Sequence, residues 1–419
     1  MSYTKVKRTK NNDDRSSDDF LMSGIRLDTG RLLDVSIEEN YAIIWIKTID
    51  GHILKLIDSY EPRFYILPKS ETEGFRLFQI LSQQTSVKKA TWDEKYTDLF
   101  SGIRSMKKLI CVYPISVQFH RILVNKLEKD TKVAQLFNTD ILHLQQYLFT
   151  KLKIEPTCKV QVEHKDSKLL EMRKIDDEET PQPPPFSSLY FEIATLSDFS
   201  DSTPLRKITV THNEQHVSFD GPEETILQDF CKYVFEEDPD ILICVTTHNR
   251  SVLTITRYLF TRAKMLGVKF QLGRQTNDIE TLTDRTQGRV VLNSSPFFNE
   301  FGLAGLVERS RFSFLPLGMA AQYGINRLID SRNCYEMIQQ EYVIPKNDFS
   351  LRHERIRTLE EIVVRDKGGM IFSPIVGLHE NVVVLDYDSE YANLILMHNL
   401  SYETIAYPRG VIQTTDRGD

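Results

Sequence analysis

Residues 382–396 constrain this 419-residue chain more than any other segment, because their hydrophobic period changes at a single carboxylate. The first four residues, Val-Val-Val-Leu, have the length and β-branched composition of a buried strand. After Asp386, residues at helical spacing follow, namely Tyr391, Leu394 and Ile395. We therefore predict a strand that turns directly into a helix, with Asp386 at the corner.

The position of Asp386 alone leaves two interpretations open. One is structural, because an aspartate just before a helix caps its free N–H groups. The other is chemical, because a carboxylate at a strand end can hold a hard cation while the N–H groups of the helix start face phosphates. The residues around Asp386 separate the two.

Those residues read Asp-x-x-Ser-x-Tyr over 386–391, followed by an apolar helix and then Asn-Leu-Ser-Tyr-Glu-Thr over 399–404. This pattern resembles motif A of B-family DNA polymerases, particularly the archaeal ones. The resemblance implies that Asp386 is a catalytic residue that binds two Mg²⁺ ions, with the backbone of Tyr387 as a further metal ligand. It also implies a nucleotide site, whose residues are Tyr387, Asp388, Ser389, Glu390 and Tyr391.

Within that site the resemblance gives Tyr391 the role of excluding ribonucleotides. The chain departs from the family around this tyrosine: the family usually has leucine at Glu390 and proline-serine at Ala392-Asn393. A glutamate beside a triphosphate is electrostatically unfavourable unless it points away. The metal ligand Asp386 is thus a firmer prediction than the nucleotide contacts.

Composition narrows the class of protein. The formal charge of −7 argues against a surface that is basic throughout, but a polymerase needs only local positive charge around its duplex. The five cysteines are scattered without a Cys-x-x-Cys pair, so we predict neither a zinc site nor a disulfide framework. No signal peptide or long apolar run is present, which predicts an intracellular, cytoplasmic protein without a membrane partner.

The first half of the chain is predicted to hold a polar, disordered tail at 1–19, a β-rich N-terminal domain at 20–165 and a proline-rich linker at 166–187. Strands are expected at 33–37, 41–47, 53–57 and 63–67, forming a meander with a hairpin turn at Asp50-Gly51. A helix is expected at 139–149. This domain resembles the N-terminal domain of archaeal B-family polymerases.

From residue 188 strands and helices alternate, with strands expected at 189–193, 207–211 and 241–245 and helices at 224–236 and 250–266. The order resembles the 3′–5′ exonuclease domain of the same polymerases, a ribonuclease-H-like fold, here spanning 188–330. A connecting segment at 331–371 and the start of the palm at 372–419 follow. The predicted fold is therefore a mixed α/β multidomain chain.

The segment that resembles the exonuclease domain lacks most of the carboxylates that the family has there. The first motif should read Phe-Asp-Ile-Glu-Thr but reads Phe-Glu-Ile-Ala-Thr, which gives Glu192 and Ala194. Ser251 and Asn293 stand where the family has aspartates, and the third motif has no counterpart. Since this chemistry uses several carboxylates around two metal ions, we predict an inactive exonuclease. The Asp-Ile-Glu-Thr sequence at 278–281 has polar flanks and reads as a coincidence in a loop.

The sequence at 366–369, Asp-Lys-Gly-Gly, resembles the Tyr-x-Gly-Gly segment that contacts the template backbone in the family. Gly368 and Gly369 are accordingly predicted to bind DNA, since glycines let a phosphate approach the main chain. Asp366 replaces the family tyrosine.

Together these resemblances imply the N-terminal part of a DNA-directed DNA polymerase that transfers nucleotides from dNTPs to a primer. The expected partners are primer–template DNA, dNTP and a C-terminal polypeptide or region with the fingers, the remaining palm and the thumb, with a sliding clamp as a further candidate. The second catalytic aspartate is not in the chain, so catalysis by this chain alone is not expected. The alternative is a non-catalytic paralogue that binds DNA or a replication partner as a scaffold.

Overall fold

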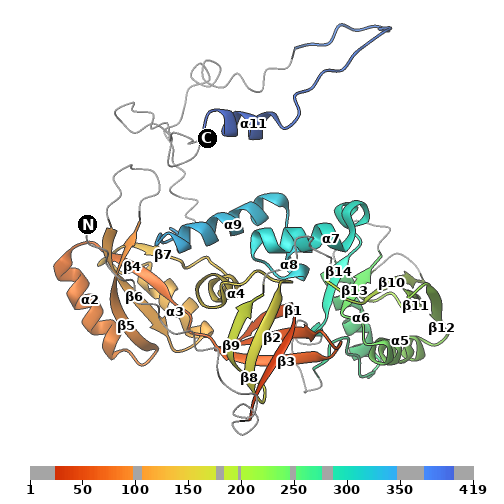
Figure 1. Ribbon diagram of the computed structural model, residues 1–419, viewed down its shortest axis with the longest axis horizontal. Helices are drawn as coiled ribbons and strands as arrows, with labels where there is room; N and C mark the ends of the chain where they lie inside the picture. The colour runs from red at the N-terminus through yellow and green to blue at the C-terminus, as the bar shows by residue number, and fades with distance from the viewer. Residues whose placement is uncertain are drawn as a thin grey trace, which may run out of the picture.

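A computed structural model describes residues 24–97, 106–175, 184–196, 200–245, 252–275, 286–346 and 372–400 (Figure 1). Three sheets and the helices between them form the part of the chain up to residue 346. The described N-terminal part begins in a closed barrel of order β1-β2-β3-β9-β8. Its strands are β1 Ile25–Glu38, β2 Tyr41–Thr48, β3 Ile53–Ser59, β8 Lys159–Lys165 and β9 Lys168–Lys174.

The barrel confirms the predicted hairpin between β2 and β3. Lys47 pairs with Ile53, and Gly51 in the turn has a φ of +91°, which side-chain-bearing residues rarely adopt. Alternate residues such as Leu32, Ile44 and Val160 fill the barrel interior because successive strand residues point to opposite faces. The predicted helix at 139–149 is shifted along the chain: α4 His143–Tyr147 begins later than predicted and continues into the π-helix η1 Leu148–Leu152.

Two sequence predictions about this half are wrong. Strand β9 lies inside the segment predicted as a linker at 166–187, because Lys168–Lys174 pairs antiparallel with β8. The expected meander also ends at β3, since β4 Phe64–Pro68 joins another sheet. The reason is local: the buried Tyr60 hydroxyl bonds to Gln146 Oε1 at 2.7 Å, and the backbone N–H of Arg63 donates to the same oxygen at 3.0 Å. These bonds direct the chain out of the barrel.

The second sheet has the order β5-β6-β4-β7. Its remaining elements are α2 Glu71–Gln83, β5 Val87–Tyr96, β6 Met106–Pro114, α3 Val117–Leu127 and β7 Val133–Phe137. Ser70 and Ser116 cap α2 and α3, and Leu77, Leu81, Leu123 and other apolar residues of the helices pack against the sheet. Much later in the chain, isolated bridges from Tyr342 to Tyr96 and from Pro345 to Phe137 bring it back along this sheet.

The third sheet confirms the expected ribonuclease-H-like arrangement. Its order is β12-β11-β10-β13-β14, with β10, β11 and β12 antiparallel and β10, β13 and β14 parallel. The strands are β10 Ser188–Thr195, β11 Leu205–His212, β12 Gln215–Asp220, β13 Ile241–Cys244 and β14 Val290–Asn293. Helices α5 Glu223–Glu237 and α6 Val252–Met265 cover one face.

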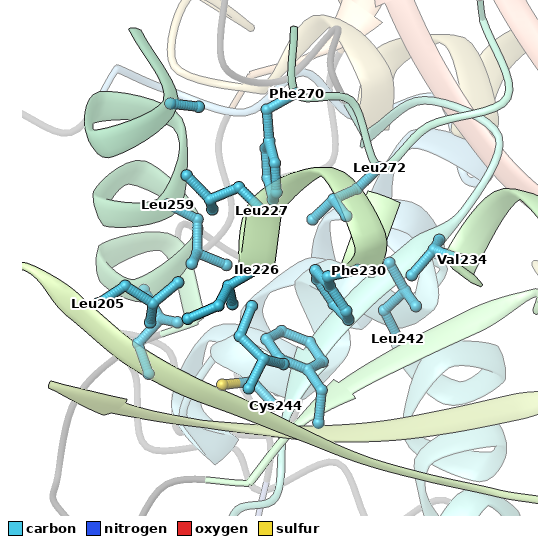
Figure 2. Packing of buried hydrophobic residues seen from close by; sticks show 14 of the residues in the cluster. Leu205, Ile226, Leu227, Phe230, Val234, Leu242, Cys244, Leu259, Phe270 and Leu272 are labelled. Atoms are coloured by element: carbon cyan, nitrogen blue, oxygen red, sulfur yellow. The ribbon is translucent and has the colours of Figure 1, made fainter. Parts of the chain in front are cut away.

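Packing on that face follows the helical period. Ile226, Leu227, Phe230 and Val234 of α5 point together toward the sheet in Figure 2, where Leu205 and Leu242 meet them. The three remaining helices before residue 346 are α7 Pro296–Ser313, α8 Leu317–Gln322 and α9 Ile325–Gln339. None of the helices in the described ranges is long and apolar enough to cross a lipid bilayer. The mixed α/β fold class is thus confirmed.

The barrel and the third sheet share one apolar core. Leu33, Ile43 and Trp45 from the outer face of the barrel pack with residues of the parallel strands and of α7 and α8. The contributions from the strands are Ile241, Ile243, Val290 and Leu292. A buried ion pair joins the same two units, because Lys47 Nζ on β2 donates to Asp240 at the start of β13.

The segment 372–400 contains α11 Glu390–Met397, which confirms the predicted helix. The predicted strand at 382–385 is not formed: these residues pair with no strand in the described part of the chain, and all four are exposed. A strand requires a partner for its backbone groups, and sequence period cannot supply one. The apolar side chains of residues 382–385 are therefore exposed to solvent.

Removing the charge of Asp240 should destabilise the barrel–sheet contact. Asp240→Asn leaves Lys47 and Arg274 without their shared buried counter-charge, and we expect a loss of about 3 to 5 kcal/mol in the free energy of unfolding. Urea unfolding followed by circular dichroism measures this.

The matched control is Glu236→Gln, which removes an exposed i,i+4 pair with Lys232 and should cost less than about 0.5 kcal/mol. Equal unfolding midpoints for the two variants would show that the buried pair does not hold the units together.

Candidate functional site

The corner at Asp386 has a specific backbone conformation. Ser389, the residue before α11, has a φ of +51° in the left-handed region, and the backbone N–H of Asn393 donates to its carbonyl at 2.9 Å. The Asn393 amide Nδ2 also donates to the Asp388 carbonyl at 2.8 Å. Asn393, a departure from the family pattern, therefore ties the corner to the first turn of the helix.

The predicted metal and nucleotide residues lie next to one another along this corner and are exposed. Tyr387 is 81% and Tyr391 79% exposed, and Asp386, Asp388 and Glu390 are exposed as well. Glu390 is the first residue of α11, where a carboxylate interacts favourably with the helix dipole. Among the described residues no group of three or more histidine, cysteine, aspartate or glutamate side chains is arranged to hold a metal.

A second candidate site is the edge where the three parallel strands of the third sheet end. The register places Phe191, Cys244 and Asn293 in one row across β10, β13 and β14. The ladder continues past the strand ends, because the Val245 N–H donates to the Phe191 carbonyl at 2.8 Å and the Ser294 N–H to the Cys244 carbonyl at 3.0 Å. Side chains just beyond this row share one edge of the sheet.

Of the four predicted degenerate positions, the structure describes three at this edge. Glu192 and Ala194 are exposed on the same face of β10, while Asn293 ends β14. Ser251 lies outside the described residues, as do the Asp278–Glu280 coincidence and the predicted DNA contacts Gly368 and Gly369.

The donor set of the edge does not suit two Mg²⁺ ions. Glu192 is the one carboxylate among Glu192, Ala194, Cys244 and Asn293, and hard cations require several oxygen ligands. Cys244 is fully buried, and burial, with a smaller effect from the charge of Glu192, raises the pKa of its thiol to about 12. A thiol in this state is neither a nucleophile nor a metal ligand.

The sequence analysis did not place Cys244 in the row of residues at this edge of the third sheet. The apolar run Ile-Leu-Ile-Cys marked a buried strand, but only pairing with β10 and β14 shows which residue ends level with Phe191 and Asn293. The hydrophobic character of cysteine was the available signal.

Comparisons with known proteins agree with this geometry. Residues 316–417 match the family described as DNA polymerase family B. DNA polymerase 2 of Saccharolobus solfataricus is 36% identical over 101 residues, which are 24% of this chain and 16% of that protein. The DNA polymerase of Thermococcus gorgonarius is 22% identical over 415 residues, covering 83% of this chain and 51% of that protein.

The fold matches a solved structure as well. The family B DNA polymerase from the archaeon Pyrobaculum calidifontis superimposes with a TM-score of 0.70 at 18% identity, covering 91% of this chain and 57% of that one. The expected resemblance to the N-terminal part of archaeal-type B-family DNA polymerases is thereby confirmed. This chain spans about half, or less, of the length of each of the relatives named here.

The inert state of Cys244 is testable by alkylation. With a pKa of about 12, roughly one thiol in ten thousand is ionised near pH 8, so iodoacetamide should leave Cys244 unmodified in the native chain. Peptide mass spectrometry reads the modification at each cysteine. Unfolding in urea is the control and should expose all five thiols. Rapid alkylation of native Cys244 would contradict the burial described here.

Proposed function

We propose that this chain is the N-terminal part of a DNA-directed DNA polymerase that adds nucleotides from dNTPs to a DNA primer. The observation that carries the proposal is the family match over 316–417 together with the corner inside it, where Asp386 immediately precedes α11. In this proposal Asp386 is the catalytic aspartate. The DNA and dNTP partners are those that the relatives' activity requires.

The corner supplies part of the donor set that Mg²⁺ takes. The carboxylate of Asp386 and the carbonyl of Tyr387 are oxygen ligands of the right kind, and they would hold the ion together with a second carboxylate from outside the corner. When bound, the ion would neutralise charge on the phosphates during transfer. Backbone groups over 387–390 would orient the triphosphate, and the ring of Tyr391 would select the sugar.

Asp386 requires a second carboxylate for two-metal transfer, and the segment that contains it exposes apolar side chains. Val383, Val384 and Leu385 are each more than three-quarters exposed, as expected for a strand that lacks neighbours. Pairing with further palm strands would cover this apolar surface and bring the second carboxylate to Asp386. We propose that a C-terminal polypeptide or region with those strands, the fingers and the thumb completes the enzyme.

The ribonuclease-H-like domain is proposed to be inactive as an exonuclease. The support is the donor set at its sheet edge, with Glu192 alone among the described positions able to bind Mg²⁺ as a carboxylate. The same observation favours a second candidate function for this domain, a scaffold that supports DNA or a replication partner without hydrolysing it.

The purified chain should not degrade single-stranded DNA from its 3′ end with Mg²⁺ or Mn²⁺, because the carboxylates at the sheet edge are too few. End-labelled oligonucleotides resolved on denaturing gels measure this. Activity that disappears in an Asp278→Ala, Glu280→Ala double variant would instead show that the 278–281 sequence is a working motif.

Primer extension should appear when the chain is combined with a polypeptide that carries the missing polymerase elements, and Asp386→Ala should abolish it because a metal ligand is lost. Tyr391→Ala should mainly raise ribonucleotide incorporation. Glu380→Gln, at an exposed acidic residue upstream of the corner, is the control and should extend primers normally. Unchanged extension with Asp386→Ala would remove motif A from the mechanism and favour the scaffold.

A further inference from the structure

A cavity of about 420 Å³ lies between the barrel and the third sheet, away from both candidate sites. Strand β1 forms one wall, and β14 and α8 form others. Most of the lining is apolar, including Val35, Leu144, Val291 and Met319. The volume is within the range of small-ligand pockets.

Among the described residues that line this cavity, Asp34 is the one that is acidic, and a β-bulge brings it there. The pairing of β1 with β2 skips from Leu32 opposite Ile46 to Asp34 opposite Trp45, so Leu33 is the additional residue. Leu32 and Val35 point into the barrel, whereas Leu33 and Trp45 belong to the core outside it. Asp34, opposite Trp45, consequently faces outward to the cavity.

No cation among the described residues forms an ion pair with Asp34. The cationic residue among the described lining residues is Arg289, which is 4% exposed and bonded to other groups. Its guanidinium donates to the carbonyls of Pro239 at 2.9 Å and Leu272 at 2.7 Å, and it pairs with Asp238. Asp34 is therefore a carboxylate in apolar surroundings without a counter-charge.

We propose that this cavity binds a small organic ammonium ion, an apolar body with one protonated amine, through an ion pair with Asp34. The charge of such a ligand complements the carboxylate of Asp34, while its hydrocarbon part replaces water against Leu144, Val291 and Met319. A hard metal ion fits less well, because one carboxylate supplies too few oxygen ligands. The ligand would contact the barrel and the third sheet together.

The ion pair fixes the pH dependence of binding. Burial raises the pKa of Asp34 to about 7, so without ligand the carboxyl is mostly neutral below that pH and mostly ionised above it. An ammonium ion pairs with the ionised form only. Its apparent affinity should therefore rise about tenfold from about pH 6 to about pH 8, and binding near neutral pH should release a proton.

The test uses the full 419-residue chain with benzylamine as the probe and benzyl alcohol as its neutral counterpart. Calorimetric titration should show saturable binding of benzylamine near pH 8, weaker binding near pH 6, and a heat that depends on the ionisation enthalpy of the buffer. Asp34→Asn should lose at least about tenfold in affinity, the loss expected for removing a charged partner. Benzyl alcohol cannot form the ion pair with Asp34, so its affinity for the native chain should be as low as the affinity of benzylamine for Asp34→Asn.

Asp166→Asn is the matched control, because Asp166 lies in the β8–β9 turn of the same barrel with a φ of +53°, which asparagine also tolerates. It should bind benzylamine like the native chain. Equal affinities for the amine and the alcohol, no change between the two pH values, or native affinity in a folded Asp34→Asn would each overturn the proposal. The first two comparisons need no variant, so they decide the question even if Asp34→Asn fails to fold.

Discussion

The buried carboxylate of Asp240 is the interaction that fixes how the barrel and the third sheet meet. Its side chain is 1% exposed and accepts from Lys47 on β2, from Arg274 at 3.0 Å and from the backbone N–H of Ser187 at 2.8 Å. Ser187 immediately precedes β10, and Asp240 immediately precedes β13. One carboxylate thus sets the start of both parallel strands, and their common register determines which residues end level at the opposite edge.

Local patterns predicted the elements whose causes are local. The β2–β3 hairpin needed only Asp50-Gly51 between two apolar runs, and α5 needed only apolar residues at helical spacing. Pairing across long stretches of sequence was beyond such patterns. β4 leaves the barrel because of hydrogen bonds to Gln146, which is more than 80 positions away. β9 forms a hairpin with the adjacent β8, but it closes the barrel only through β3, where the Ile57 N–H donates to the distant Ser167 carbonyl.

In the candidate sites, too, the features with local causes were predictable and those that depend on strand pairing were not. The helix after Asp386 was predictable because its period is in the sequence, and Glu390–Met397 forms it. The strand before it was not, since a strand exists only through the hydrogen bonds of a neighbour. At the edge where the parallel strands of the third sheet end, the small number of carboxylates could be read from residues 191–195 and 293. The place of Cys244 between Phe191 and Asn293 depended on the parallel register of the strands, which no local pattern contains.

The geometry of β10 shows which of its side chains the fold of the third sheet depends on. Leu189 and Phe191 point into the core, where they pack against α5, whereas Glu192 and Ala194 alternate with them on the exposed face. At these exposed positions a carboxylate and an alanine are both compatible with the fold, because neither side chain contributes apolar burial to the core. The opposite face of the sheet is also structural. Its residues Ile241, Ile243 and Leu292 complete the core against the barrel. The packing that holds this sheet therefore does not depend on which side chains stand at the exposed positions of β10.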